Sequence, residues 1–191
     1  MAVADFLLTP GMQKVLAAAY GDPERSFTLN ELLALAGGGH GSSQGQIERL
    51  IAAGVLEEGP RRARQRCIKA NTDFFFYPEL RSIAMKSFAL AEPLRKALEP
   101  FRSRINEAFV FGSIAKGTDT HRSDVDLIVV GRVALMKLST AMLELEKTIG
   151  RPIQLNLYSY NEWLQLKRTD AVIAQILNAP RIQIFPHATS D

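Results

Sequence analysis

The sequence predicts an α+β protein with two domains: a helical N-terminal domain closed by a two-stranded hairpin, then a mixed sheet with flanking helices. Three observations predict this. The 191 residues are 47% hydrophobic and 23% charged, which suits a globular chain with two modest cores. Capping residues and glycines bracket helix-length segments in the first half. In the second half, short apolar runs alternate with amphipathic segments.

The first two helices are predicted from their ends. Thr9 can cap a helix over residues 10–20, and Gly21 follows the end of that helix. Thr28 and Glu31 have the spacing of a capping box, in which each side chain bonds to the backbone of the other residue. A second helix therefore starts at Thr28, and it stops at three consecutive glycines, residues 37–39.

A third helix and a hairpin complete the predicted N-terminal domain. The helix covers residues 42–53 and carries an apolar stripe at helical spacing. Residues 55–56 begin a strand, residues 57–65 form a charged turn, and residues 67–68 return as a second strand. Three helices followed by a two-stranded wing predict a winged helix-turn-helix domain over residues 1–77. The stripe consists of Ile47, Leu50 and Ile51.

Double-stranded DNA is the partner that this domain predicts. The net charge of +3 is too small to imply a partner, but basic residues crowd the wing. The third helix would enter the major groove, and wing arginines commonly reach phosphates or a narrow minor groove. A solvated charged turn, partly offset by Glu57 and Glu58, and a protein-interaction fold are the alternatives. The predicted DNA-binding residues are Ser43, Gln44, Gln46 and Arg49 on the helix and Arg61, Arg62, Arg64 and Arg66 on the wing.

A linking helix and a second domain follow. Residues 78–100 predict one long helix, interrupted or kinked near Pro93, and this helix is the expected contact of a homodimer. The second domain covers residues 101–186, and residues 187–191 are a flexible tail. Its predicted strands are 105–111, 123–130, 152–158 and 181–185, and its predicted helices are 134–150 and 161–177.

A glycine-serine turn follows the first strand of this domain. Gly112 allows a phosphate to approach the backbone closely, and Ser113 adds a hydroxyl donor. A short helix that begins here would present free backbone N–H groups, which suit phosphate oxygens. Lys116 could add a positive charge beside the same phosphates. The turn therefore predicts a site for the phosphates of an NTP.

Two aspartates lie one residue apart at the start of the next strand. Asp124 and Asp126 share one face of that strand, with Cα atoms ~6.5 Å apart. Two such carboxylates can hold Mg²⁺ (or Mn²⁺), with substrate phosphates and water filling the remaining positions. A lone glycine-serine turn or a lone Asp-x-Asp would have a bland explanation, whereas their combination at neighbouring strand ends predicts a phosphate and metal site.

These motifs carry a family resemblance. The segments Gly-Ser-x-Ala-x-Gly, from Gly112, and Ser-Asp-x-Asp-Leu, from Ser123, resemble the minimal nucleotidyltransferases of the polymerase-beta superfamily. Residues 77–98 and 150–158 extend the likeness to a prokaryotic family in which a winged helix of transcription-regulator type precedes such a domain. The resemblance implies that the glycine and Ser113 hold the triphosphate. It also implies that the two aspartates bind the catalytic metals, and Lys116 and Ser123 complete the predicted nucleotide site.

One position departs from the family. Active members carry a third carboxylate on a neighbouring strand, where it helps to activate the attacking hydroxyl. Here the polar face of that strand holds Gln154 and Asn156, and an amide cannot act as a general base. Asp119, Glu162 or Asp170 could substitute, although nothing in the sequence places them there.

Three functions compete on this evidence. The first is a DNA-binding transcriptional regulator whose C-terminal domain binds an NTP and a divalent metal. The second is an active nucleotidyltransferase that modifies a protein, nucleic acid or small-molecule hydroxyl, including a role in a toxin–antitoxin system. The third is a structural remnant that only dimerises.

Composition predicts the compartment. Cys67 is the single cysteine, so no disulfide can form within the chain, and a reducing compartment is expected. The N-terminus lacks the cationic start of a signal peptide, and no apolar run approaches the ~18 residues of a membrane span. The expected location is therefore the cytoplasm, with no membrane contact.

Overall fold

The computed structural model describes residues 4–37, 40–62, 65–120 and 122–186. The chain divides into two compact units, Met1–Leu90 and Ala91–Asp191, and each contains both helices and strands, which confirms a mixed α+β fold. The division falls inside the segment 78–100, and the predicted tail lies outside the described residues. Across the described ranges, no helix is both long enough and apolar enough to cross a membrane.

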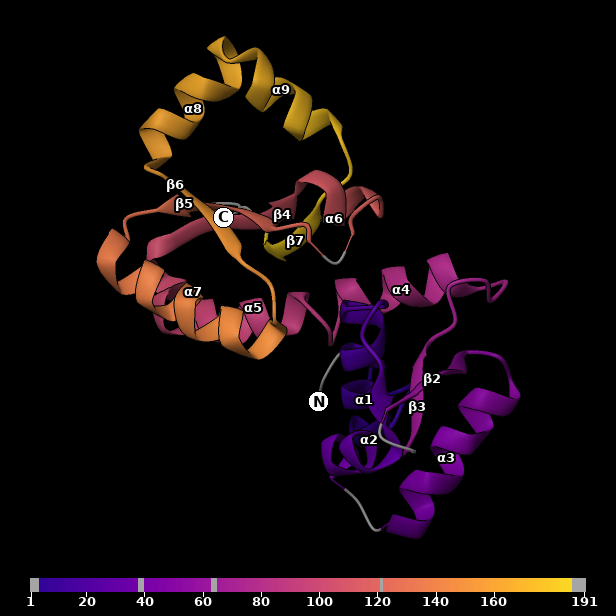
Figure 1. The fold of residues 1–191 in the computed structure, drawn as a ribbon. Coiled ribbons are helices and arrows are strands. Elements are labelled where there is room, and N and C mark those ends of the chain that lie inside the picture. Colours follow the sequence, from indigo (N-terminus) through magenta and orange to yellow (C-terminus); the bar gives the residue numbers. More distant parts are fainter. Residues whose placement is uncertain (1–3, 38–39, 63–64, 121, 187–191) are drawn as a thin grey trace. The chain divides into compact units, whose positions relative to one another are not determined.

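Three helices open the N-terminal unit, and local capping explains the first two of them (Figure 1). The Thr9 hydroxyl accepts the backbone N–H of Met12. Thr28 and Glu31 form the predicted capping box, and Gly37 ends that helix at φ 65°. These contacts confirm where the first two helices begin. The helices are α1 (Pro10–Gly21), α2 (Leu29–Ala36) and α3 (His40–Ala52).

A small antiparallel sheet packs against these helices. Its strand order is β1-β3-β2, from β1 (Phe27–Thr28), β2 (Leu56–Arg62) and β3 (Gln65–Ala70). The prediction of a charged turn over residues 57–65 is wrong, because Glu57 and Lys69 are cross-strand partners and form an ion pair of 3.1 Å. Alternating side chains keep such charges on the solvent side. The core of the unit includes Val15, Tyr20, Leu32, Ile47, Leu56, Ile68 and Ala84.

The predicted linking helix is two helices, α4 (Tyr77–Lys86) and α5 (Ala91–Leu98). The chain leaves the helix at Ser87, whose hydroxyl donates to the Ile83 carbonyl and so competes with the backbone ladder. Pro93 causes no kink, because it lies in the first turn of α5, where its missing N–H would have no intrahelical partner.

The C-terminal unit is built on a four-stranded mixed sheet in the order β6-β5-β4-β7. Strand β4 runs antiparallel to both β5 and β7, whereas β5 and β6 are parallel. The predicted helix over residues 161–177 is interrupted at Asp170, which caps a separate second helix. In chain order after α5, the elements are η1 (Glu99–Arg104), β4 (Ile105–Phe111), α6 (Gly112–Lys116), β5 (Val125–Gly131), α7 (Leu135–Ile149), β6 (Ile153–Tyr158), α8 (Tyr160–Thr169), α9 (Ala171–Asn178) and β7 (Ile182–Phe185).

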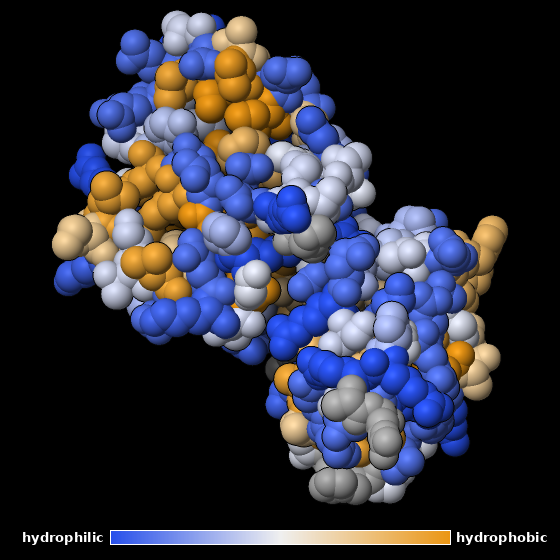
Figure 2. All heavy atoms as spheres, viewed as in Figure 1, coloured by the Kyte–Doolittle hydropathy of each residue, from blue (hydrophilic) through white to orange (hydrophobic). Residues whose placement is uncertain are grey.

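Helices cover both faces of this sheet, with α5 and α7 on one side and α8 and α9 on the other (Figure 1). Trp163 of α8 and Ile173 of α9 pack with Phe109, Ile128 and Val130 of the sheet. Figure 2 shows apolar atoms at the surface near α8 and α9, where Leu166, Ile176 and Leu177 are only partly buried. Since side chains alternate along a strand, the side chain of Asp126, two residues before Ile128 on β5, also faces the α8/α9 side.

Candidate functional site

The glycine-serine turn and the second aspartate are in direct contact. Strand pairing aligns Phe111 with Asp126, which places the next residue, Gly112, against the aspartate side chain. A Cβ atom built on Gly112 would lie 2.1 Å from Asp126 Oδ2 and 3.0 Å from Cγ. The backbone at Gly112 also has φ +74°, which favours glycine. Only a residue without a side chain leaves room for this carboxylate.

The turn opens the short helix α6. Phe111, at its N-cap position, has an apolar side chain and cannot cap the first N–H groups. Ser113 is partly buried, and Lys116 is exposed in the last turn. Gly117 ends the helix at φ 74°. Backbone N–H groups, one hydroxyl and one ammonium group are thus available on α6 to meet phosphate oxygens.

The two aspartates form a like-charge pair. Asp124 is exposed immediately before β5, and Asp126 is partly buried within β5. Burial raises the pKa of the Asp126 carboxyl, and the negative charge of Asp124 raises this pKa further. A bound divalent cation would offset both causes, so these two residues fit a metal site.

The raised pKa has a consequence for stability. Between the pKa of Asp126 in the unfolded chain and its higher pKa in the folded chain, the folded state binds more protons. The contribution of Asp126 to stability therefore falls as pH rises through that window. Above the folded pKa, the ionised carboxylate destabilises the metal-free fold by the full amount.

Gln154 occupies the position beside Asp126 on the neighbouring parallel strand. Strand pairing aligns Asp126 with Gln154 and Ile128 with Asn156, so Gln154 is the nearer of the two amides. Gln154 is exposed, and its backbone carbonyl accepts a hydrogen bond from Asn156 Nδ2 at 3.4 Å. Of the two amides that sequence reasoning left open for the third-carboxylate position implied by the resemblance, the register thus favours Gln154.

The three acids named as substitutes for this carboxylate have other roles. The Asp119 side chain is fully buried and forms an ion pair with Arg151. Glu162 completes a capping box with Ser159, which lowers the pKa of the Glu162 carboxyl. Asp170 accepts the first N–H groups of α9. Across the described ranges, no group of three His, Cys, Asp or Glu side chains converges on a possible metal position. A metal held here would depend on substrate oxygens to complete its ligands.

Sequence reasoning missed Arg151, which is 5% exposed and donates to the loop before Asp124. Ser123, predicted to bind nucleotide, lies in that loop. Its hydroxyl accepts the Thr120 N–H at 2.9 Å, and its carbonyl accepts from Arg151 at 3.3 Å. Only the position of Arg151, between a helix-ending glycine and a proline, hinted at a structural role.

On helix α3, the predicted DNA contacts differ in exposure. Ser43 is only 8% exposed, which argues against the DNA contact predicted for it. The helical stripe that buries Ile47 extends one turn back to Ser43, because residues four apart share a helix face. Gln46 is partly buried, and its Oε1 lies 3.4 Å from the Thr9 hydroxyl, which donates to it. Gln44 and Arg49 are exposed.

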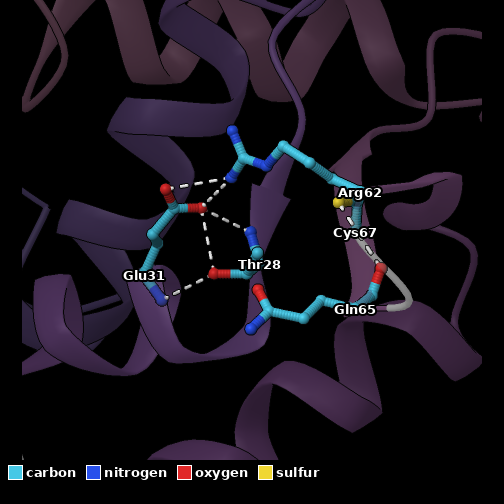
Figure 3. A network of polar contacts seen from close by, with 5 residues as sticks. All are labelled: Thr28, Glu31, Arg62, Gln65 and Cys67. Carbon is cyan, nitrogen blue, oxygen red and sulfur yellow. Dashed lines mark hydrogen bonds and ion pairs between the residues drawn. The ribbon is translucent and has the colours of Figure 1, made fainter.

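In the hairpin, carboxylates within the same unit engage two of the predicted arginines. Arg62 donates to both carboxylate oxygens of Glu31, at 3.0 and 2.8 Å (Figure 3). Arg66 pairs with Glu48 at 2.7 Å and with Glu58 at 2.8 Å. Arg61 is exposed, whereas Arg64 lies outside the described residues. The positive charge that the hairpin can offer to phosphates is therefore smaller than the sequence predicts.

Comparison with known proteins identifies the C-terminal domain. Residues 92–176 match the family described as polymerase beta, nucleotidyltransferase. This part of the chain is thus a nucleotidyltransferase-like domain, as the resemblance predicted. None of the curated proteins compared with the chain matches it.

Several solved structures are similar over about half of the chain. A toxin–antitoxin complex with AMP-PNP is 17% identical, with a TM-score of 0.38, over 52% of this chain and 75% of that one. A complex of a tri-AMPylated Shewanella oneidensis HEPN toxin with its MNT antitoxin is 14% identical, with a TM-score of 0.32, over 50% and 68% of the two chains. A nucleotidyltransferase-like protein from Sulfolobus solfataricus is 13% identical, with a TM-score of 0.33, over 57% and 90%. Likeness at this level carries no argument about substrate or partner.

Proposed function

We propose that the C-terminal unit transfers a nucleoside monophosphate from an NTP to an acceptor hydroxyl, with Mg²⁺ or Mn²⁺ as cofactor. The observation that carries this proposal is the contact between Gly112 and the Asp126 carboxylate, beside Asp124. It unites a possible phosphate site and a possible metal site within the domain that matches the nucleotidyltransferase family.

Each residue then has a chemical task. Asp124 and Asp126 hold the metal, which, when bound, neutralises charge on the phosphates. The backbone at Gly112 and the Ser113 hydroxyl orient the triphosphate, and Lys116 adds a positive charge. The acceptor oxygen forms a bond to the α-phosphorus, while the bond between the α-phosphorus and the oxygen that bridges it to the β-phosphorus breaks. Pyrophosphate leaves, and the proton of the acceptor hydroxyl passes to solvent.

The test is label transfer from α-labelled NTPs to the components of a cell lysate, with Mg²⁺ or Mn²⁺. We expect labelling by the wild-type chain that disappears in Asp124→Asn and Asp126→Asn and persists in the surface control Glu144→Gln. Glu144 pairs only with exposed Lys147 among the ion pairs of α7, so its loss changes little. Labelling that is equal in all four chains, or absent from the wild type with every NTP, would contradict the proposal.

The same variants separate chemistry from folding. Because the ionised Asp126 destabilises the metal-free fold, Asp126→Asn is expected to unfold at a temperature equal to or above that of the wild type at pH values above the raised pKa of Asp126. This difference should shrink as pH falls through the raised pKa of Asp126. A variant that loses label transfer while gaining thermal stability has lost a functional group rather than its structure.

For the N-terminal unit we propose a second function, DNA binding by a winged helix-turn-helix. Its support is the element order of helix, strand, two helices and hairpin, together with exposed Gln44, Arg49 and Arg61. Arg49→Ala with Arg61→Ala is expected to weaken duplex binding and to reduce the slope of log affinity against log salt by about 2. Arg62→Ala is the control, since Glu31 already engages Arg62. If the double variant keeps the wild-type slope of log affinity against log salt, the proposal that this unit binds DNA is contradicted.

A further inference from the structure

The loop between α6 and β5 ends at Asp124, and the structure describes its residues 118–120 and 122–124. Three of its acceptor atoms converge on one nitrogen of Arg151. Nη1 of Arg151 lies 3.0 Å from Asp119 Oδ2, 3.0 Å from the Thr120 carbonyl oxygen and 3.3 Å from the Ser123 carbonyl oxygen. The side chains of Arg151 and Asp119 are 5% and 0% exposed. A buried guanidinium therefore bonds to three residues of the loop, Asp119, Thr120 and Ser123.

Both peptide groups that flank Asp124 are held by the same two-residue segment. The peptide before Asp124 contributes the Ser123 carbonyl, which accepts from Arg151. The peptide after it contributes the Val125 N–H, which donates to the Pro152 carbonyl at 2.8 Å. Arg151 and Pro152 immediately precede β6, the strand that carries Gln154. The backbone of Asp124 is thus fixed against the base of this strand.

The contacts within the loop have a different effect. The Thr120 N–H donates to the Ser123 hydroxyl at 2.9 Å, and the Ser123 N–H donates to the Thr120 carbonyl at 3.1 Å. These bonds set the shape of the turn, but both partners belong to it. The bonds from Arg151 instead fix the position of the turn relative to β6.

Charge makes a purely stabilising role a poor explanation. Asp119 balances Arg151, so the pair adds no net charge beside the two site aspartates and leaves their attraction for a cation intact. Apolar residues of similar size often replace a buried ion pair without loss of stability, whereas the directed bonds of a guanidinium have no apolar substitute. The buried pair is therefore better explained by the geometry that it imposes.

We propose that Arg151 is a positioning residue, which holds the Asp124 backbone so that the two site carboxylates meet one metal ion. The inference rests on the proposed function of the C-terminal unit. Partners that orient metal ligands typically contribute 10–100-fold to metal affinity. Arg151→Met should therefore weaken Mn²⁺ binding by about that factor. Arg151→Lys keeps the charge but lacks the planar fork, so it should recover only part of the loss.

The experiment compares these variants of the full chain with Leu138→Ala. Leu138 lies fully buried on α7, outside the loop, and its truncation lowers stability. Mn²⁺ affinity, measured by titration calorimetry or by the paramagnetic resonance of free Mn²⁺, is read beside the unfolding temperature. The expected result is a large loss of affinity in Arg151→Met and a change within about twofold in Leu138→Ala at a similar unfolding temperature. Equal affinities in the two variants would overturn the proposal.

Two further results keep the test decisive. If Arg151→Met does not fold, the comparison of Arg151→Lys with Leu138→Ala decides, and wild-type affinity in Arg151→Lys overturns the inference. If the wild type binds no Mn²⁺, the proposed function fails separately. The positioning of the Asp124 backbone by Arg151 is then judged by hydrogen exchange at the Ser123 and Val125 amides. Faster exchange in the Arg151 variants than in Leu138→Ala supports this positioning role, and equal exchange refutes it.

Discussion

Gly112→Ala is expected to reduce both metal-dependent NTP binding and label transfer by about 10²-fold or more. The added Cβ would lie 2.1 Å from Asp126 Oδ2, so the carboxylate must move from its position. This neighbour is the proposed metal ligand itself, so relief of the clash removes the ligand from the site. Calorimetric titration with an NTP and Mn²⁺ measures the first loss, and the lysate assay measures the second.

Gly117→Ala provides a control that isolates the clash from backbone strain. Gly117 has the same φ of +74°, but nothing among the described residues lies within 4 Å of a Cβ built there. Both variants therefore carry the cost of a left-handed alanine, roughly 1–2 kcal/mol. We expect Gly117→Ala to keep NTP affinity within a few-fold of wild type. Similar losses in the two variants would mean that strain, and not contact with Asp126, explains the glycine.

The features that the sequence predicts best are those set by near neighbours in the chain. The Thr9 cap and the capping box of Thr28 with Glu31 involve residues three positions apart, so their spacing is visible without a structure. The strands around the site are equally local, since apolar runs define them. The sequence places Gly112 and Asp126 at two strand ends, and the pairing of β4 with β5 then brings them together.

What the sequence could not supply depends on partners far apart in the chain. Arg62 and Glu31 are 31 residues apart, and Arg151 and Asp119 are 32 apart. No periodicity reports such pairs, so the hairpin arginines looked free to meet DNA and Arg151 went unnoticed. Ser43 shows a related limit, because a small polar residue at the edge of an apolar stripe can point either way until the helix packs.

The helix break before α5 shows that the effect of a proline depends on its position within a helix. Pro93 suggested a kink within one long helix, yet it lies in a first turn, which tolerates proline. The true break is at Ser87, a residue that carries no strong helix-ending signal. Its side-chain bond to the Ile83 carbonyl becomes visible only in the folded chain.

Gln154→Glu is expected to increase the rate of nucleotidyl transfer, with a gain of about 10²–10⁴-fold if the new carboxylate acts as a general base. Strand pairing places Gln154 directly beside Asp126 on the neighbouring parallel strand. Glutamate has the shape of glutamine, so the change replaces one amide nitrogen with an oxygen that can accept the acceptor's proton. Label transfer at saturating NTP measures the rate.

The control for this gain is Asn156→Asp, which adds the same charge on the same face. Asn156 aligns with Ile128, two residues along the strand from Asp126 of the proposed metal site. The carboxylate introduced by Asn156→Asp should therefore have little effect on the rate.

The third carboxylate of Gln154→Glu also adds repulsion in the metal-free chain. The pKa of Asp126, already raised by burial and by Asp124, should rise further in Gln154→Glu, and metal binding should become more steeply dependent on pH. Unchanged transfer with intact NTP binding would show that this position does not limit the chemistry. The amide in the natural chain would then have to be explained by nucleotide binding rather than by slow catalysis.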